Sequence, residues 1–177
     1  HTVAHNTVVV DRIDQSREAT ARLRCLNAAG PVRFVEVETV NAYPQCPVYR
    51  RAVLMVGEDY VLDVFRVLGG TRHEYAFHAY GNMTVRGLKR VRRVPETVSA
   101  TAEGYKLLAG FQKGTAWGDL EVLWRKPTSD EDGTVGLRMR MLSDPLVPIT
   151  TVRFGPGYLA DEENPVGMVI LERWGGR

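Results

Sequence analysis

The stretch "VYRRAVLMVGEDYVLDVFRVLGG", residues 48–70, predicts the fold class of this chain. It holds two runs rich in Val, Leu, Phe and Tyr, which favour β-strands, separated by "GED" at 57–59. Because Gly and Asp tolerate the backbone dihedrals of a tight turn, the two runs are predicted to form a β-hairpin. The glycines at 69–70 then break the chain before "RHEYAFHAY", residues 72–80. We predict that this segment is the third strand of an antiparallel meander.

Strand-like patterns continue on both sides of this stretch. "VRFVEVETV", residues 32–40, alternates apolar and polar residues with the period of a half-buried strand. Residues 95–118 show no such period and are predicted to be a long excursion over a sheet face. Further strands are expected at 120–125, 135–142, 149–155 and 166–174. Since no helix pattern is found, the chain is predicted to be all-β, an antiparallel β-sandwich of two or more layers that forms a single domain, 1–177.

Composition excludes some classes of protein. The 177 residues are 44% hydrophobic and 25% charged, and no apolar run approaches the roughly 18 residues that a membrane span needs. A formal net charge of +2 is too small to indicate a nucleic-acid partner. Cys25 and Cys46 either form one disulfide or stay free. Because the chain begins with His and not Met, we expect a processed form or a piece of a larger protein.

Cations concentrate in "RGLKRVRRV", residues 86–94, where five of nine residues are Arg or Lys. Such a cluster would attract a polyanion such as an acidic polysaccharide. Cationic side chains also protect exposed sheet edges from aggregation, so a solvated edge strand explains the segment equally well. The sequence leaves both interpretations open.

The sequence lacks the common phosphate-loop, zinc-pair and nucleophile motifs. The histidines are therefore the best candidates for a functional site. His5 lies at a strand entrance, where an imidazole can bind a metal, transfer a proton or only support the structure. Alternation along 72–80 puts His73 and Tyr75 on one strand face and His78 on the other. The imidazoles of His73 and His78 are therefore not expected to bind one metal ion from a regular strand.

Three segments together resemble the C-terminal β-sandwich portion of the heparinase II/III-like polysaccharide lyases. They are "AHNTVVVDRIDQ" at 4–15, "AYPQCPVYRRAVLMVGEDYVLDVFRVLGG" at 42–70 and "HEYAFHAYGN" at 73–82. A His-Asn-Thr-Val strand that ends in Asp is a marker of that family. The resemblance covers roughly residues 1–82 and fades after them.

The resemblance implies a lyase with an α/α toroid followed by β-sheet layers, which cleaves uronate-containing glycans such as heparan sulfate or alginate by β-elimination. The main catalytic groups of such enzymes lie in the toroid, which this chain lacks, so its own catalytic residues are unknown and the chain alone is expected to be inactive. Many members hold a structural zinc, for which His5 is the expected ligand here. The partner ligands belong to a His-x-His segment that would precede His1, in the same or another chain. The resemblance also implies a bacterial periplasmic or secreted protein.

The leading functional hypothesis is a sandwich that lines one side of a cleft for an acidic polysaccharide. The expected substrate-binding residues are His73, His78, Tyr75, Arg50, Arg51 and Arg90, with Lys89, Arg92 and Arg93 adding positive charge. Strands that lack their neighbours would expose an edge, which self-association as a homo-oligomer could cover. The alternative is a non-catalytic carbohydrate-binding or assembly sandwich, whose candidate sugar-stacking aromatics are Tyr43, Tyr49, Trp117 and Trp124. The same aromatics are also typical of a sandwich core.

Overall fold

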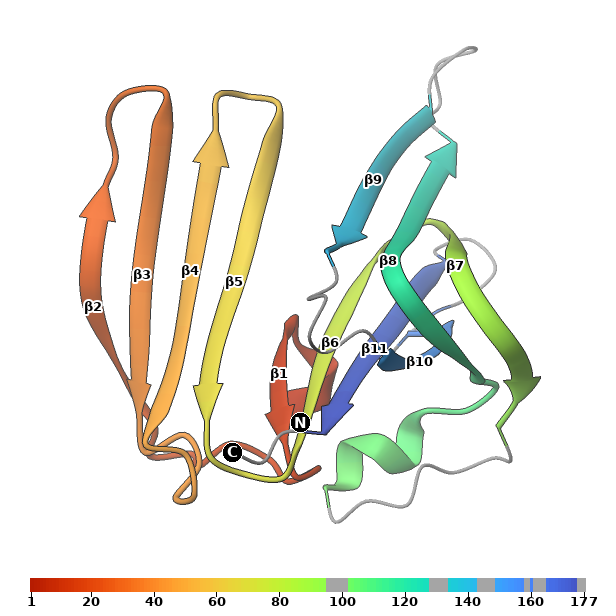
Figure 1. Cartoon of the computed structure of the whole chain (residues 1–177), viewed down its shortest axis with the longest axis horizontal. Coiled ribbons are helices and arrows are strands. Elements are labelled where there is room, and N and C mark those ends of the chain that lie inside the picture. The colour runs from red at the N-terminus through yellow and green to blue at the C-terminus, as the bar shows by residue number, and fades with distance from the viewer. Residues whose placement is uncertain (95–101, 128–133, 143–148, 158–159, 161–164, 175–177) are drawn as a thin grey trace. The chain divides into compact units, whose positions relative to one another are not determined.

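The structure is a computed structural model that describes residues 1–94, 102–127, 134–142, 149–157, 160 and 165–174. Within these residues, eleven strands and two short 3-10 helices form the secondary structure (Figure 1). The first six strands are β1 (Thr7–Val10), β2 (Thr20–Asn27), β3 (Val32–Val40), β4 (Val48–Val56), β5 (Tyr60–Leu68) and β6 (Arg72–Tyr80). The others are β7 (Asn82–Arg93), β8 (Gln112–Pro127), β9 (Thr134–Met141), β10 (Ile149–Pro156) and β11 (Val166–Trp174). The 3-10 helices are η1 (Thr2–Ala4) and η2 (Glu103–Leu107).

The strand pairings are antiparallel, and the sheets comprise a half-barrel and a second sheet. The predicted all-β, antiparallel fold class is therefore confirmed, and the architecture is consistent with a β-sandwich. The chain divides into two compact units: a first unit of His1–Asp14 with Arg72–Trp174, and a second unit within Gln15–Thr71. That the whole chain acts as one domain stays a prediction. Among the described residues, no helix has the length and apolar character needed to cross a bilayer.

The first unit is built on one curled sheet with the strand order β1-β6-β11-β10-β8-β7, and β9 also pairs with β8 (Figure 1). The 16-residue β8 makes the curl possible because its two halves have different partners. Its first half pairs with β10 and its second half with β9, while β7 follows it along most of its length. Gly118 lies between the two halves with a φ of 95°, a conformation that favours glycine over residues with a Cβ.

Both faces of this sheet are covered by apolar side chains. One cluster joins Val9, Ala76 and Ile170 to side chains around η2 such as Tyr105. The other cluster is formed by β6 to β11 around the fully buried Trp124. The central strand β11 contributes to both clusters, which explains its nearly continuous apolar sequence.

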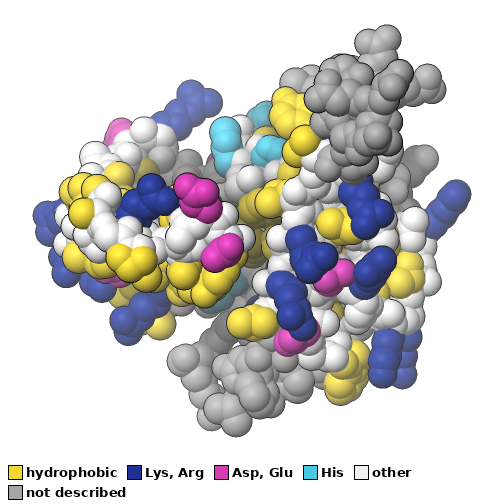
Figure 2. Space-filling view, turned by 90° about the horizontal axis from the view of Figure 1, so that it is seen from above, with side chains coloured by type: hydrophobic (Ala, Val, Ile, Leu, Met, Phe, Trp, Pro, Cys, Tyr) yellow, Lys and Arg dark blue, Asp and Glu magenta, His cyan; other side chains and the backbone are white. Residues whose placement is uncertain are grey.

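The second unit is a four-stranded sheet with the order β2-β3-β4-β5. The predicted hairpin is confirmed, because Val56 lies opposite Tyr60 across the turn. Cys25 and Cys46 are both free thiols. Hydrophobic side chains are exposed on the surface of the molecule, as Figure 2 shows in yellow, and several belong to this sheet. The large ones at least 50% exposed are Leu23, Leu26, Tyr60, Val61 and Val64.

Two sequence predictions about connectivity are wrong. The strand at 72–80 does not extend the hairpin as a meander, because β6 pairs with β1 and β11. Gly69 and Gly70 have φ values of 91° and 72°, which redirect the chain from one sheet into the other. The predicted excursion over 95–118 is wrong for 112–118, which belong to β8, while 95–101 lie outside the described residues. Gly114, Ala116 and Gly118 hide this strand, since small residues have weak strand preference.

Candidate functional site

The junction of β1 and β6 brings together two histidines that the sequence had left in separate motifs. Thr7 lies opposite Ala76 at the end of the ladder, and His5, two residues before Thr7, lies close enough to His78 for its charge to act on that imidazole. The side chain of Asn6 supports the arrangement at this end of the ladder. Its Nδ2 donates to the His78 carbonyl at 3.2 Å, and its Oδ1 accepts from the His78 N–H at 2.8 Å.

The surroundings of His78 perturb its imidazole. Burial lowers its pKa, and the nearby charge of His5 lowers the pKa further. The Nδ1 atom of His78 is buried and has no hydrogen-bond partner in the described part of the chain. Since a buried polar atom without a partner is costly, this nitrogen is suited to a ligand atom or a proton. The pair therefore combines an exposed imidazole, His5, with a half-buried one that favours the neutral form.

These two imidazoles do not complete a zinc site. Zinc in proteins normally has three or four protein ligands. Among the residues described by the structure, no group of three or more His, Cys, Asp or Glu side chains is arranged to hold a metal ion. His1 Nδ1 lies 3.6 Å from Asp14, so that imidazole already has a carboxylate partner.

The other two candidates on β6 face away from His78. Tyr75 packs against Phe77, with ring centroids 6.0 Å apart, at the edge of the cluster around Trp124. His73 lies on the same side of β6 as Tyr75, because residues two apart in a strand share a face. The structure thus brings His5 and His78 together and separates them from His73 and Tyr75.

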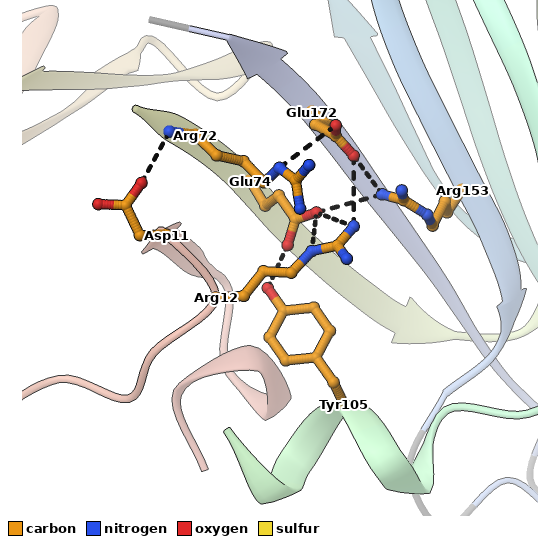
Figure 3. Close-up of polar contacts among 7 residues, drawn as sticks. All are labelled: Asp11, Arg12, Arg72, Glu74, Tyr105, Arg153 and Glu172. Atoms are coloured by element: carbon orange, nitrogen blue, oxygen red, sulfur yellow. Dashed lines mark hydrogen bonds and ion pairs between the residues drawn. The ribbon is translucent and has the colours of Figure 1, made fainter. Parts of the chain in front are cut away.

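Figure 3 shows a buried ionic network that the sequence did not predict. Its residue Glu74 lies on the same face of β6 as His78, because the two are an even number of positions apart in the strand. Glu74 of β6 is 0% exposed and Glu172 of β11 is 4% exposed. Arg12 Nε lies 2.9 Å and Arg153 Nη1 3.1 Å from Oε1 of Glu74. Arg153 also donates to Glu172, and Arg72 Nε lies 3.5 Å from that carboxylate. Three guanidinium groups therefore surround two carboxylates.

Neighbouring arginines keep the Glu172 carboxylate of this network ionised. Burial would raise the pKa of Glu172, but the charges of Arg153, Arg72 and Arg12 outweigh it and lower the pKa. The hydroxyl of Tyr105, from η2, donates to the second oxygen of Glu74. A signal for this network was present in the sequence, because an acidic residue inside a strongly apolar strand indicates a buried partner. The residues next to each glutamate in the sequence do not indicate which arginines are its partners.

Arg50 and Arg51 belong to the second unit and already have acidic partners. Arg50 Nε donates to Glu38 at 3.0 Å. Arg51 makes two hydrogen bonds of 2.8 Å to Asp63. These arginines are therefore partly engaged in cross-strand pairs, which act within the sheet of that unit.

The cations of 86–94 lie on β7, which is an edge strand of the first unit. Lys89, Arg90, Arg92 and Arg93 are exposed, and within the described residues no ion pair is found for them. Arg90 has a φ of 55°, in the left-handed region. The edge-strand interpretation of this segment is confirmed, and its charge stays available to an anion.

Among the aromatic candidates for sugar stacking, Trp117 is accessible with an exposed fraction of 55%. Tyr43, Tyr49 and Trp124 are at most 5% exposed. The core interpretation is therefore confirmed for these three.

The comparisons with known proteins give no match. No family model, curated protein or solved structure is similar to this chain at the level that would indicate a relationship. The resemblance to heparinase II/III-like lyases accordingly stays a prediction from the motifs. The features of the chain that bear on function are those motifs, the geometry of the β1 and β6 junction and the charge on β7.

Proposed function

We propose that this chain is the β-sandwich portion of a polysaccharide lyase that cleaves uronate-containing acidic glycans by β-elimination. In this proposal the first unit lines one side of the substrate cleft. The observation that carries it is the junction of β1 and β6. Two segments of the family resemblance, 4–15 and 73–82, contribute neighbouring strands there, with His5 near His78.

The chemistry assigns a limited role to this chain. β-Elimination needs neutralisation of the uronate carboxylate, removal of the proton on the adjacent carbon and protonation of the leaving oxygen. The groups that move protons are expected in polypeptide outside this chain. His5 and His78 would contact the glycan or complete a zinc site with ligands from that polypeptide, and the exposed cations of β7 would attract the polyanion. The same proposal implies a bacterial periplasmic or secreted enzyme.

An elimination assay tests the proposal. The protein is produced in the longest form that its gene encodes and incubated with heparan sulfate, alginate or hyaluronan, and the ultraviolet absorbance of the unsaturated product is followed. His78→Ala should lower the rate by roughly ten- to hundredfold, as loss of a residue that supports a site does. His1→Ala is the matched control, because His1 is an exposed imidazole near the same chain end. Absence of product from all three glycans would refute the lyase proposal.

The alternative function, a non-catalytic carbohydrate-binding or assembly sandwich, is favoured by one observation. Trp117 presents an exposed indole on β8, and an exposed ring can stack on a sugar. Quenching of tryptophan fluorescence by neutral oligosaccharides that does not change with salt and is lost in Trp117→Ala would support it. Binding that weakens as salt rises would favour the acidic glycan instead.

A further inference from the structure

A hollow in the first unit is lined almost entirely by cations. Its volume is about 430 Å³, and among the described residues its lining consists of Arg92, Arg93, Val94, Lys113 and Arg153. Four of these five side chains carry positive charge. None of the four was assigned to the β1 and β6 junction, so the hollow is a second feature of this unit.

Strand register explains why these cations converge. Lys113 of β8 lies opposite Arg153 of β10 on one side and opposite Arg92 of β7 on the other. Directly opposed residues of antiparallel strands project from the same face with Cβ atoms roughly 5 Å apart. Because like charges in this position destabilise a sheet, the arrangement has a cost that a bound anion would remove.

The β7 backbone is distorted at this place. The register of β7 against β8 shifts between Lys89 and Arg92, and Arg90 within that shift has a φ of 55°. The left-handed region is sterically unfavourable for a residue with a Cβ. A bulge re-aims the side chains that follow it, here Arg92 and Arg93, and bulges are frequent next to binding sites.

Among the described residues, the positive charge in the hollow is only partly neutralised. Arg153 is held by Glu74 and Glu172, but these two carboxylates are shared with two more arginines. Within the described residues, no ion pair involves Arg92, Arg93 or Lys113. The network therefore fixes the position of Arg153, and the other three cations have no acidic partner in the described part of the chain.

We propose that this hollow binds a tetrahedral oxoanion of the sulfate or phosphate type. Guanidinium groups suit such an anion because they offer paired donors in a planar fork, and Lys113 adds a point charge. The anion is either free in solution or a sulfate ester on a polysaccharide, and the second source rests on the proposed function.

Calorimetric titration of the chain at low salt tests this site. The probes are inorganic phosphate, inorganic sulfate, a heparin oligosaccharide and an unsulfated oligouronate of the same length. Lys113→Met and Arg92→Ala should weaken binding by roughly tenfold or more, the effect of losing one charge-assisted contact. Lys126→Ala is the matched control, since it removes one exposed cation from the far end of the same strand. The affinity of Lys126→Ala for the anions should stay within about twofold of that of the unchanged chain, because exposed charges at that distance are largely screened.

The outcomes distinguish the sources and the two proposals. Binding of the inorganic anions supports a site for a free anion, and binding of the heparin oligosaccharide alone supports a sulfated glycan. Absence of binding to every probe overturns the proposal. An equal loss of affinity in Lys126→Ala and Lys113→Met overturns it too, as does an affinity for the unsulfated oligouronate equal to that for the heparin oligosaccharide. A chain that binds inorganic phosphate but belongs to a protein without elimination activity would refute the lyase proposal and leave this site intact.

Discussion

The side chain of Asn6 forms two hydrogen bonds with the backbone of His78, 72 positions away in the sequence. The amide of Asn is complementary to a peptide group, since it offers one donor side and one acceptor side. Asn6 therefore continues the ladder between β1 and β6 past the first residue of β1. It also keeps His5 close enough to His78 for the charge of His5 to affect the pKa of His78.

Replacing Asn6 with Ala should destabilise the first unit by about 1–3 kcal/mol, because two part-buried backbone groups of His78 lose their partners. Chemical denaturation followed by tryptophan fluorescence measures this, since Trp117, Trp124 and Trp174 are all in the first unit. Asn82→Ala, at an exposed position of β7, is the matched control and should change stability by less than about 0.5 kcal/mol. Equal effects of the two variants would contradict the role assigned to Asn6.

His78 should make stability depend on pH in the mildly acidic range. Its pKa in the folded state is lowered from the ordinary value of 6.5, so the unfolded state binds more protons between the two values. The contribution is fully present above the ordinary pKa, and it is lost as the pH falls through the lowered one. His5→Gln should raise the pKa of His78 but leave it below 6.5, because burial remains. An NMR titration of the imidazole checks this, and an unchanged pKa would show that His5 exerts no influence.

Glu172 should contribute stability at neutral pH that acid removes. Because its pKa is lowered in the folded state, its contribution is present above the ordinary carboxyl pKa and is lost as the pH falls through the folded value. Glu172→Gln should cost about 3–5 kcal/mol at neutral pH, since buried guanidinium groups lose a counter-ion. Glu121→Gln removes a more exposed carboxylate that pairs with Arg86 and Arg138, and it should cost at most about 1 kcal/mol. Equal costs in denaturant titrations would mean that the buried network carries no special weight.

Tyr105→Phe isolates the hydrogen bond from η2 to the network. The ring, which is 0% exposed, stays in place, and only the hydroxyl that donates to Glu74 is lost. The free energy of unfolding should fall by about 1.5–3 kcal/mol, the range for a hydrogen bond to a charged group. Tyr80→Phe, at a residue that is 69% exposed, is the control and should have little effect. Comparable losses in both variants would contradict the assigned contact.

Two glycines of the second unit allow the cost of a left-handed backbone to be measured apart from the cost of a steric clash with an added Cβ. Both have positive φ, 91° at Gly69 and 80° at Gly30. A Cβ at Gly69 would lie 2.0 Å from the Gln45 carbonyl oxygen, whereas a Cβ at Gly30 would meet nothing within 4 Å. Gly30→Ala should therefore cost about 1–2 kcal/mol from the left-handed conformation alone, and Gly69→Ala clearly more. Amide hydrogen exchange of β4 and β5 measures the difference, and equal protection in both variants would rule out the collision.

Much of the secondary structure was predictable because strand alternation and turn chemistry act over a few residues. The hairpin of β4 and β5 is the clearest case, with its turn at 57–59. β2 was missed because its cations interrupt the apolar pattern, and the start of β8 was missed because small residues carry little strand preference. The candidate site divides in the same way. The histidines were found as residues, but the meeting of His5 with His78 was not.

Local patterns in this sequence were enough to establish the all-β class, most strands and the opposite orientation of His73 and His78, since each depends on neighbours within a few positions. Tertiary structure alone decided that β6 leaves the hairpin for β1 and β11, that Glu74 and Glu172 share three arginines, and that Lys113 meets Arg92 and Arg153. Each of these depends on strand pairing between distant segments. Pairing follows from the burial of whole sheet faces, and no short stretch of sequence contains that information.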